Sequence, residues 1–184
     1  MGCLGACDGI AILPSLGVVA AVSDDSVFAL RLSDGIRVGS LAVPNLWMFL
    51  AADDATGAVY GNVASSTGYD VHAWNFSADG ASIRTMSNGP VTAAGTRSES
   101  RPLTVIPPAP CKAVSYLVVG TGESSELLVL SLPSLALTHT HTLEGMDLTG
   151  LAADPSGGAL AVFDRESGAL HVLAWPLPGM PPLQ

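Results

Sequence analysis

The chain has 184 residues, of which 48% are hydrophobic and only 12% charged, and its formal net charge is −9. With seven basic residues it lacks the clusters of lysine and arginine that contact phosphates, which argues against nucleic acid as a partner. Twenty glycines and thirteen prolines cut the apolar sequence at short intervals, a composition typical of an all-β protein.

Residues 1–9 are predicted to form an N-terminal tail. Met1-Gly2-Cys3 is similar to the start of dually acylated proteins, but Ala6 stands where the acylation pattern requires Ser or Thr. A plain tail and an acylated one are both kept as alternatives. The three cysteines (Cys3, Cys7 and Cys111) have no zinc-site spacing and indicate free thiols in a reducing compartment. No apolar run reaches 18 residues and no secretory signal is recognised, so we expect a cytoplasmic protein without a transmembrane segment.

Short apolar runs bounded by turn residues follow from residue 10 onward, and none has helical periodicity. They group into four modules, which we place at 10–41, 48–86, 103–143 and 148–175. In the first two modules the expected strands are 10–13, 18–22, 27–32 and 36–41, then 48–52, 58–64, 70–76 and 82–86. A polar surface connector is predicted at 87–101.

The third module is expected to have strands at 103–106, 116–120, 126–132 and 136–143. The fourth has them at 148–152, 159–164 and 169–175, and it then enters a Pro-rich C-terminal tail at 176–184. Prolines at this density do not form a central strand, so the fourth module is expected to lack its last strand or to borrow one. The total is about 15 strands in four sheets.

A weak internal repeat supports this division. Residues 50–59 (LAADDATGAV) return as 151–160 (LAADPSGGAL), and Ala73-Trp74 returns as Ala174-Trp175. Both matches have the same offset of about 100 positions, a period typical of modular repeats. Tandem four-stranded modules of this length predict a β-propeller of about four blades, each antiparallel. Because the last blade is incomplete, the chain is also compatible with an open fragment of a larger ring.

Particular segments resemble known propeller repeats. Residues 26–35 (SVFALRLSDG) resemble the third strand and turn of NHL and YVTN-type repeats, and 151–157 (LAADPSG) are similar to their first strand and turn. Residues 71–75 (VHAWN) are less closely similar to a WD40 strand, because the preceding Gly-His of that family is absent. The resemblance implies a protein-interaction or scaffolding role.

Acidic residues gather in the loops between the second and third strands and between successive modules. They include Asp24, Asp25, Glu123, Asp164 and Glu166, with Glu144 and Asp147 in the connection between modules three and four. In a propeller these loops share one rim, which predicts a docking surface for a basic peptide or protein. Turn chemistry is the alternative explanation, because Asp and Ser favour tight turns. Trp47, expected in a loop on the same rim, is the aromatic interface candidate.

The other aromatic and histidine residues have structural explanations. Trp74 and Trp175 are expected at equivalent positions near the end of a third strand, where they would pack between blades. His139 and His141 alternate on one strand and share a face, but no third metal ligand is predictable.

We therefore expect a non-enzymatic interaction module with no cofactor and no metal. It would bind a protein or basic peptide through Trp47, Asp24, Asp25, Glu123 and Asp164. Self-association through an open blade edge near Val172 is also expected. Two alternatives stay open: a propeller enzyme of the metal-dependent lactonase type, and a structural fragment of a larger multi-domain protein.

Overall fold

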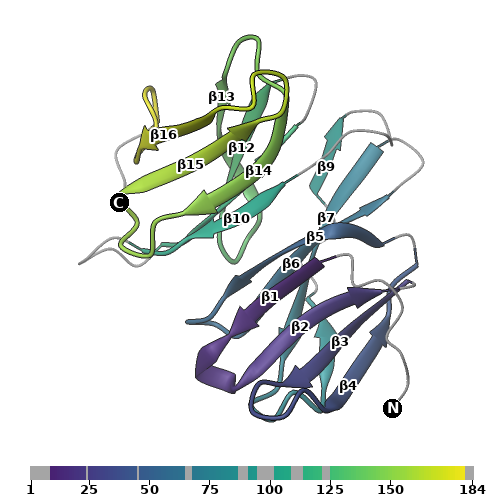
Figure 1. The fold of residues 1–184 in the computed structure, drawn as a ribbon. Helices are drawn as coiled ribbons and strands as arrows, with labels where there is room; N and C mark the ends of the chain where they lie inside the picture. Colours follow the sequence, from purple (N-terminus) through teal and green to yellow (C-terminus); the bar gives the residue numbers. More distant parts are fainter. Residues whose placement is uncertain are drawn as a thin grey trace. The chain divides into compact units, whose positions relative to one another are not determined.

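The computed structural model describes residues 9–23, 25–44, 46–64, 68–86, 91–94, 102–108, 114–121 and 125–180; at 46–48, 64, 68–69 and 91–94 it describes the backbone alone. The chain forms two compact units, Met1–Ala94 and Gly95–Gln184. Both are built from antiparallel sheets in which sequential strands are neighbours (Figure 1). In the described residues, no helix is long and apolar enough to cross a membrane. The only helix found there is a 3-10 turn at Pro14–Leu16.

The first unit contains two sheets. The first sheet has the order β1-β2-β3-β4 and the second β5-β6-β7-β8, with β9 also paired to β7. The strands are β1 (Gly9–Leu13), β2 (Val18–Ser23), β3 (Ser26–Arg31), β4 (Arg37–Ala42), β5 (Leu46–Asp53), β6 (Ala58–Ala64), β7 (Gly68–Phe76), β8 (Ile83–Thr85) and β9 (Val91–Ala94). One face of each sheet supplies the core of this unit, in which Leu13, Val27, Val59 and Trp74 are fully buried.

The second unit contains a four-stranded and a three-stranded sheet, ordered β10-β11-β12-β13 and β14-β15-β16. The strands are β10 (Leu103–Ile106), β11 (Tyr116–Gly120), β12 (Glu126–Ser131), β13 (Ala136–Thr142), β14 (Leu148–Ala153), β15 (Ala159–Asp164) and β16 (Leu170–Ala174). Ile106, Val118 and Leu127 of one sheet share a core with Leu160 and Val162 of the other. The fold is thus the expected β-propeller type with four sheets, and in the described residues the last sheet has three strands, as predicted.

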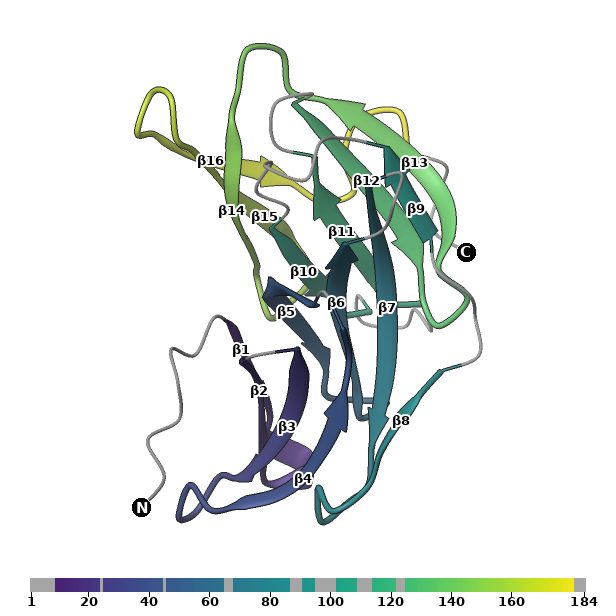
Figure 2. The ribbon, with the colours of Figure 1, turned by 90° about the vertical axis from the view of Figure 1, so that its right-hand side faces the viewer.

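The prediction of a polar surface connector at 87–101 was wrong in one respect, because this segment contains β9. In Figure 2, β8 lies beside one end of the long strand β7 and β9 beside the other. Asn75 pairs with Arg84 and Asp70 pairs with Thr92, so β8 and β9 together take the place of a single fourth strand. The sequence did not predict β9, because the segment Val91-Thr92-Ala93-Ala94 is short and flanked by turn residues on both sides.

The predicted equivalence of Trp74 and Trp175 was also wrong. Trp74 lies inside β7 and pairs with Val59, whereas Trp175 follows the end of β16. The backbone N–H of Trp175 donates to the carbonyl of Gly158, and in the second sheet Phe76 makes the matching bond to Gly57. Trp175 therefore corresponds to Phe76, because the β15–β16 hairpin is two residues shorter than the β6–β7 hairpin: Leu160 pairs with Leu173, whereas Val59 pairs with Trp74. Both tryptophans still pack in cores between two sheets.

The C-terminal segment after β16 is not a free tail throughout its length. The Leu177 side chain is 2% exposed and belongs to the core of the second unit. Trp175 lies in the same core and its ring centroid is 5.9 Å from that of Tyr116. One apolar residue among prolines gave no periodic signal, so the sequence could not predict this burial.

Blades one and three share local backbone features at matching positions. Asp25 and Ser125 both have positive φ angles (59° and 56°). Their carbonyls accept hydrogen bonds of 2.7 Å from the N–H groups of Val43 and Leu143. The strand pairings β3–β4 and β12–β13 each contain an irregularity, after Ala29 and after Val129. The repeat thus relates blade one to blade three, as it relates blade two to blade four.

Candidate acidic rim of the second unit

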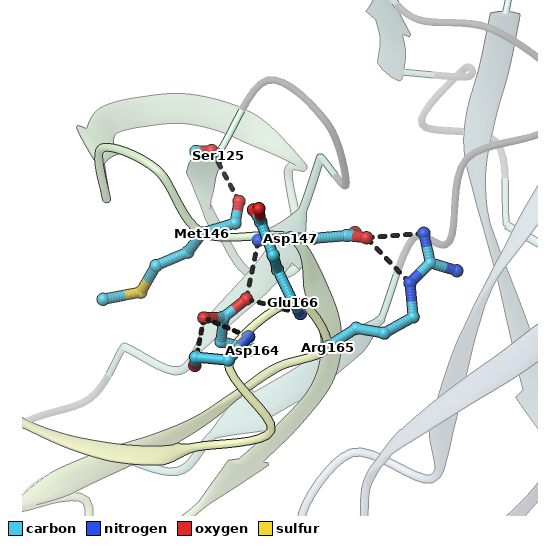
Figure 3. Close-up of polar contacts among 7 residues, drawn as sticks. Ser125, Met146, Asp147, Asp164, Arg165 and Glu166 are labelled. Atoms are coloured by element: carbon cyan, nitrogen blue, oxygen red, sulfur yellow. Dashed lines mark hydrogen bonds and ion pairs between the residues drawn. The ribbon is translucent and has the colours of Figure 1, made fainter.

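Two turns of the second unit are joined by backbone and side-chain hydrogen bonds (Figure 3). One lies between β13 and β14 and contains Asp147; the other begins at Asp164, the last residue of β15, and continues with Arg165. The Asp147 N–H donates to Asp164 Oδ1 at 2.9 Å, and the Arg165 N–H donates to the Asp147 carbonyl at 2.9 Å. We call the surface formed by these two turns, residues 143–147 and 164–169, the acidic rim.

Asp164 organises the turn and is not displayed to solvent. Its side chain is 4% exposed, and its carboxylate also accepts hydrogen bonds from the Glu166 N–H (3.1 Å), the Ser167 N–H (3.3 Å) and the Ser167 hydroxyl. The Ser167 hydroxyl, followed by the Asp147 N–H, holds the pKa of the Asp164 carboxyl below its usual value. These contacts favour the turn-chemistry explanation for Asp164 over direct partner contact.

Arg165 pairs with the neighbouring turn. Its Nε lies 2.7 Å from Asp147 Oδ2, and its Nη2 lies 2.5 Å from the same oxygen. The Arg165 side chain is 65% exposed, so the pair contributes only about 0–1 kcal/mol to stability. Its larger effect is to neutralise Asp147, which leaves fewer carboxylates of the rim available for a ligand.

Glu144 and Glu166 are the carboxylates that the rim presents outward. Both residues are exposed, and no described residue pairs with either carboxylate. Ser125 directly precedes β12, and its hydroxyl donates to the Met146 carbonyl at 2.5 Å (Figure 3). This bond links the β13–β14 turn to the neighbouring sheet. The two glutamates are therefore carried by turns that are internally hydrogen-bonded, which lowers the entropy lost when a partner binds.

Of the other predicted interface residues, the structure describes Asp25 and the backbone of Trp47. Asp25 lies in the β2–β3 turn of the first unit, and its carbonyl bond to Val43 gives it a structural role there. Trp47 was expected in a loop, but its backbone lies within β5; its side chain, like Asp24 and Glu123, lies outside the description. Sequence reasoning missed Arg165, because a salt bridge between turns 18 residues apart requires the blade geometry to be known.

The two histidines of β13 lie on one face, as predicted. The ring centroids of His139 and His141 are 6.2 Å apart and nearly parallel, and the His139 Nε2 is buried without a hydrogen-bond partner. Within the described ranges, no group of three His, Cys, Asp or Glu side chains is placed to hold a metal ion.

A groove of about 490 Å³ lies at the β1–β2, β3–β4 and β7–β8 turns of the first unit. It is lined by Leu16, Gly17, Arg31, Leu32, Ser33, Ala78 and Asp79. The Arg31 guanidinium at its margin is 2.7 Å from Asp34, and Asp79 accepts from the Ser77 hydroxyl and the Ala81 N–H. Its charged groups are thus engaged within their own turns.

The likeness to known proteins is structural. No protein-family model and no curated protein matches the chain. Among solved structures, U3-55K matches with a TM-score of 0.59 and 9% identity over 95% of this chain, and hydrazine synthase from Kuenenia stuttgartiensis with 0.64 and 13% over 94%. The WD40 domain of coronin from Toxoplasma gondii matches with 0.65 and 13% over 90%. The chain covers 53%, 51% and 42% of these three, about half of their length.

Proposed function

We propose that the chain is a non-enzymatic protein-binding module that takes a basic segment of a protein partner on the acidic rim. The observation that supports this most directly is the pair of exposed, unpaired carboxylates of Glu144 and Glu166 on hydrogen-bonded turns. The net charge of −9 attracts a basic segment from a distance and raises its rate of association. The WD40 domain among the similar structures adds the analogy of a repeat often used for interactions.

The proposal also includes the cellular location and the finer repeat type of the chain. We place the protein in the cytoplasm because its cysteines are few and odd in number, and we keep the NHL and YVTN-type likeness of residues 26–35 as the proposed finer relationship. A longer protein that contains this chain would use the rim in the same way, because the rim is built within one unit.

The test uses a fluorescent peptide of about 15 residues rich in Lys and Arg, with a neutral peptide of equal length as reference. Fluorescence anisotropy should show saturable binding of the basic peptide that weakens as salt is raised. The double variant Glu144→Gln with Glu166→Gln should weaken binding by about tenfold, because each exposed carboxylate contributes roughly 0.5–1 kcal/mol.

The matched control removes two carboxylates elsewhere while keeping the same net charge change. Asp34→Asn with Asp154→Asn retains a hydrogen-bond acceptor in two turns outside the rim. This control should bind the basic peptide almost as well as the unmodified chain. Equal loss in both double variants would mean that only overall charge matters, and the rim would no longer be the binding site.

A further inference from the structure

The sheet β14-β15-β16 ends in a strand that has no neighbour on one side. In the other three sheets the third strand is covered by a fourth: β3 by β4, β7 by β8, and β12 by β13. In the described part of the chain, no strand pairs with the outer edge of β16. An uncovered strand presents a row of N–H and C=O groups to which another strand can bind.

The hydrogen bonds to β15 show which backbone groups face this edge. The Asp164 N–H donates to the Ala169 carbonyl and the Trp175 N–H to the Gly158 carbonyl, both at 3.0 Å. In an antiparallel pair, alternate residues bond to the partner strand and the residues between them point away. The N–H and C=O groups of Leu170, Val172 and Ala174 therefore face the open edge.

The edge carries none of the features that prevent strand addition. The strand Leu170–Ala174 (LHVLA) has no charged residue and no proline, and its pairing with β15 runs over five residues without a bulge. Leu170 and Val172 are 66% and 69% exposed, and Phe163, paired with Leu170, is 41% exposed. The outer strands β4 and β13, by contrast, pair with an irregularity, and β4 also begins with Arg37.

We propose that β16 pairs antiparallel with β16 of a second copy, around a two-fold axis at Val172. This register places Val172 opposite Val172 and Leu170 opposite Ala174 on one face of the sheet, and His171 opposite Leu173 on the other. It joins the three outward-facing residues of each copy in about six backbone hydrogen bonds. Pro176, which has no N–H, ends the ladder on one side, and Gly168 ends it on the other.

The occupant is a second copy because the edge is complementary to itself. No charged side chains oppose each other in this register, since Arg165 and Glu166 lie beyond the end of the ladder. The net charge of −9 on each copy opposes the approach, so added salt should strengthen the pairing. Five paired residues make a small interface, which implies association at micromolar concentrations. This inference is independent of the proposed binding of a basic segment.

Analytical ultracentrifugation of the full chain, with protein from about 1 to about 300 µM, provides the test. We expect a shift from monomer to dimer. Val172→Lys alone and Val172→Glu alone should each give monomer, because the two-fold axis brings two like charges together. An equal mixture of the two variants should restore the dimer, since Lys then faces Glu.

Leu137→Lys is the matched control, because Leu137 is 56% exposed on the outer strand β13 of the same unit. It should dimerise like the unmodified chain, and circular dichroism should show that every variant is folded. A chain that is monomeric at all concentrations overturns the proposal, as does a dimer that survives Val172→Lys. Loss of the dimer in both charge variants without recovery in the mixture would also overturn it, since another partner surface would then be involved.

Discussion

The packing of the two sheets in the first unit can be tested by adding a single methyl group at Gly39. Gly39 lies in β4, and a Cβ added to it would stand 2.3 Å from the backbone carbonyl oxygen of Gly80. Cβ atoms essentially never approach a neighbour closer than 3.0 Å, so the sheets would have to separate by about 0.7 Å. Gly80 is itself closely packed, because a Cβ added there would lie 2.9 Å from Val18 and 3.0 Å from Val38. We expect Gly39→Ala to lower the free energy of unfolding by about 3 kcal/mol.

Urea denaturation followed by tryptophan fluorescence measures this effect. In a Trp175→Phe background the signal comes from the first unit, which holds Trp74 in its core. With a slope of about 1.5 kcal/mol/M, the midpoint of Gly39→Ala should fall by about 2 M. The control is Gly35→Ala, where φ is +70° and no atom lies within 4 Å of the added Cβ, so only backbone strain of about 1 kcal/mol is expected. A smaller shift for Gly39→Ala than for Gly35→Ala would refute the packing argument.

Two further predictions concern buried side chains. In urea denaturation of the chain that retains Trp175, Leu177→Ala should destabilise the second unit by about 2–4 kcal/mol, whereas Leu170→Ala, at an exposed position, should change stability by less than about 0.5 kcal/mol. Similar losses would mean that the C-terminal segment does not dock. Burial, helped by the charge of Asp53, raises the pKa of Tyr60 to about 12. Because the folded state holds this proton more tightly than the unfolded state, the contribution of Tyr60 is complete below pH 10 and is lost as the pH rises from 10 towards 12. Absorbance at 295 nm should show a tyrosine that titrates near pH 12, and Tyr60→Phe should abolish that step.

The repeated blade pattern could be predicted from the sequence because it depends on local signals. Apolar runs of four to seven residues between Gly, Pro and Asp turns predicted the strands of the first blade to within about two residues, and the proline run after Trp175 predicted the missing last strand. Strand β9 escaped prediction because its pairing with β7 is a tertiary contact without its own pattern.

The candidate site was less predictable, because side-chain roles depend on neighbouring turns. Composition marked Asp164 as a surface acid, but hydrogen bonds from Asp147 and Ser167 turned it into a buried support for the turn. Arg165 and Asp147 are far apart in the sequence and meet only when β14 and β15 pair. Glu144 and Glu166 are the candidate binding residues because the other two carboxylates of the rim are engaged within it: Asp147 pairs with Arg165, and Asp164 accepts hydrogen bonds from its turn.

The correspondence of Asp25 with Ser125, and of Val43 with Leu143, also bears on the history of the chain. Blade one resembles blade three and blade two resembles blade four, so the segment that was copied carries two blades and about 100 residues. Each pair of blades has its own buried core, which allows a copy to remain folded while its surface turns diverge. Growth by such copying adds blades two at a time, and the acidic residues of the rim are present in only one of the two copies.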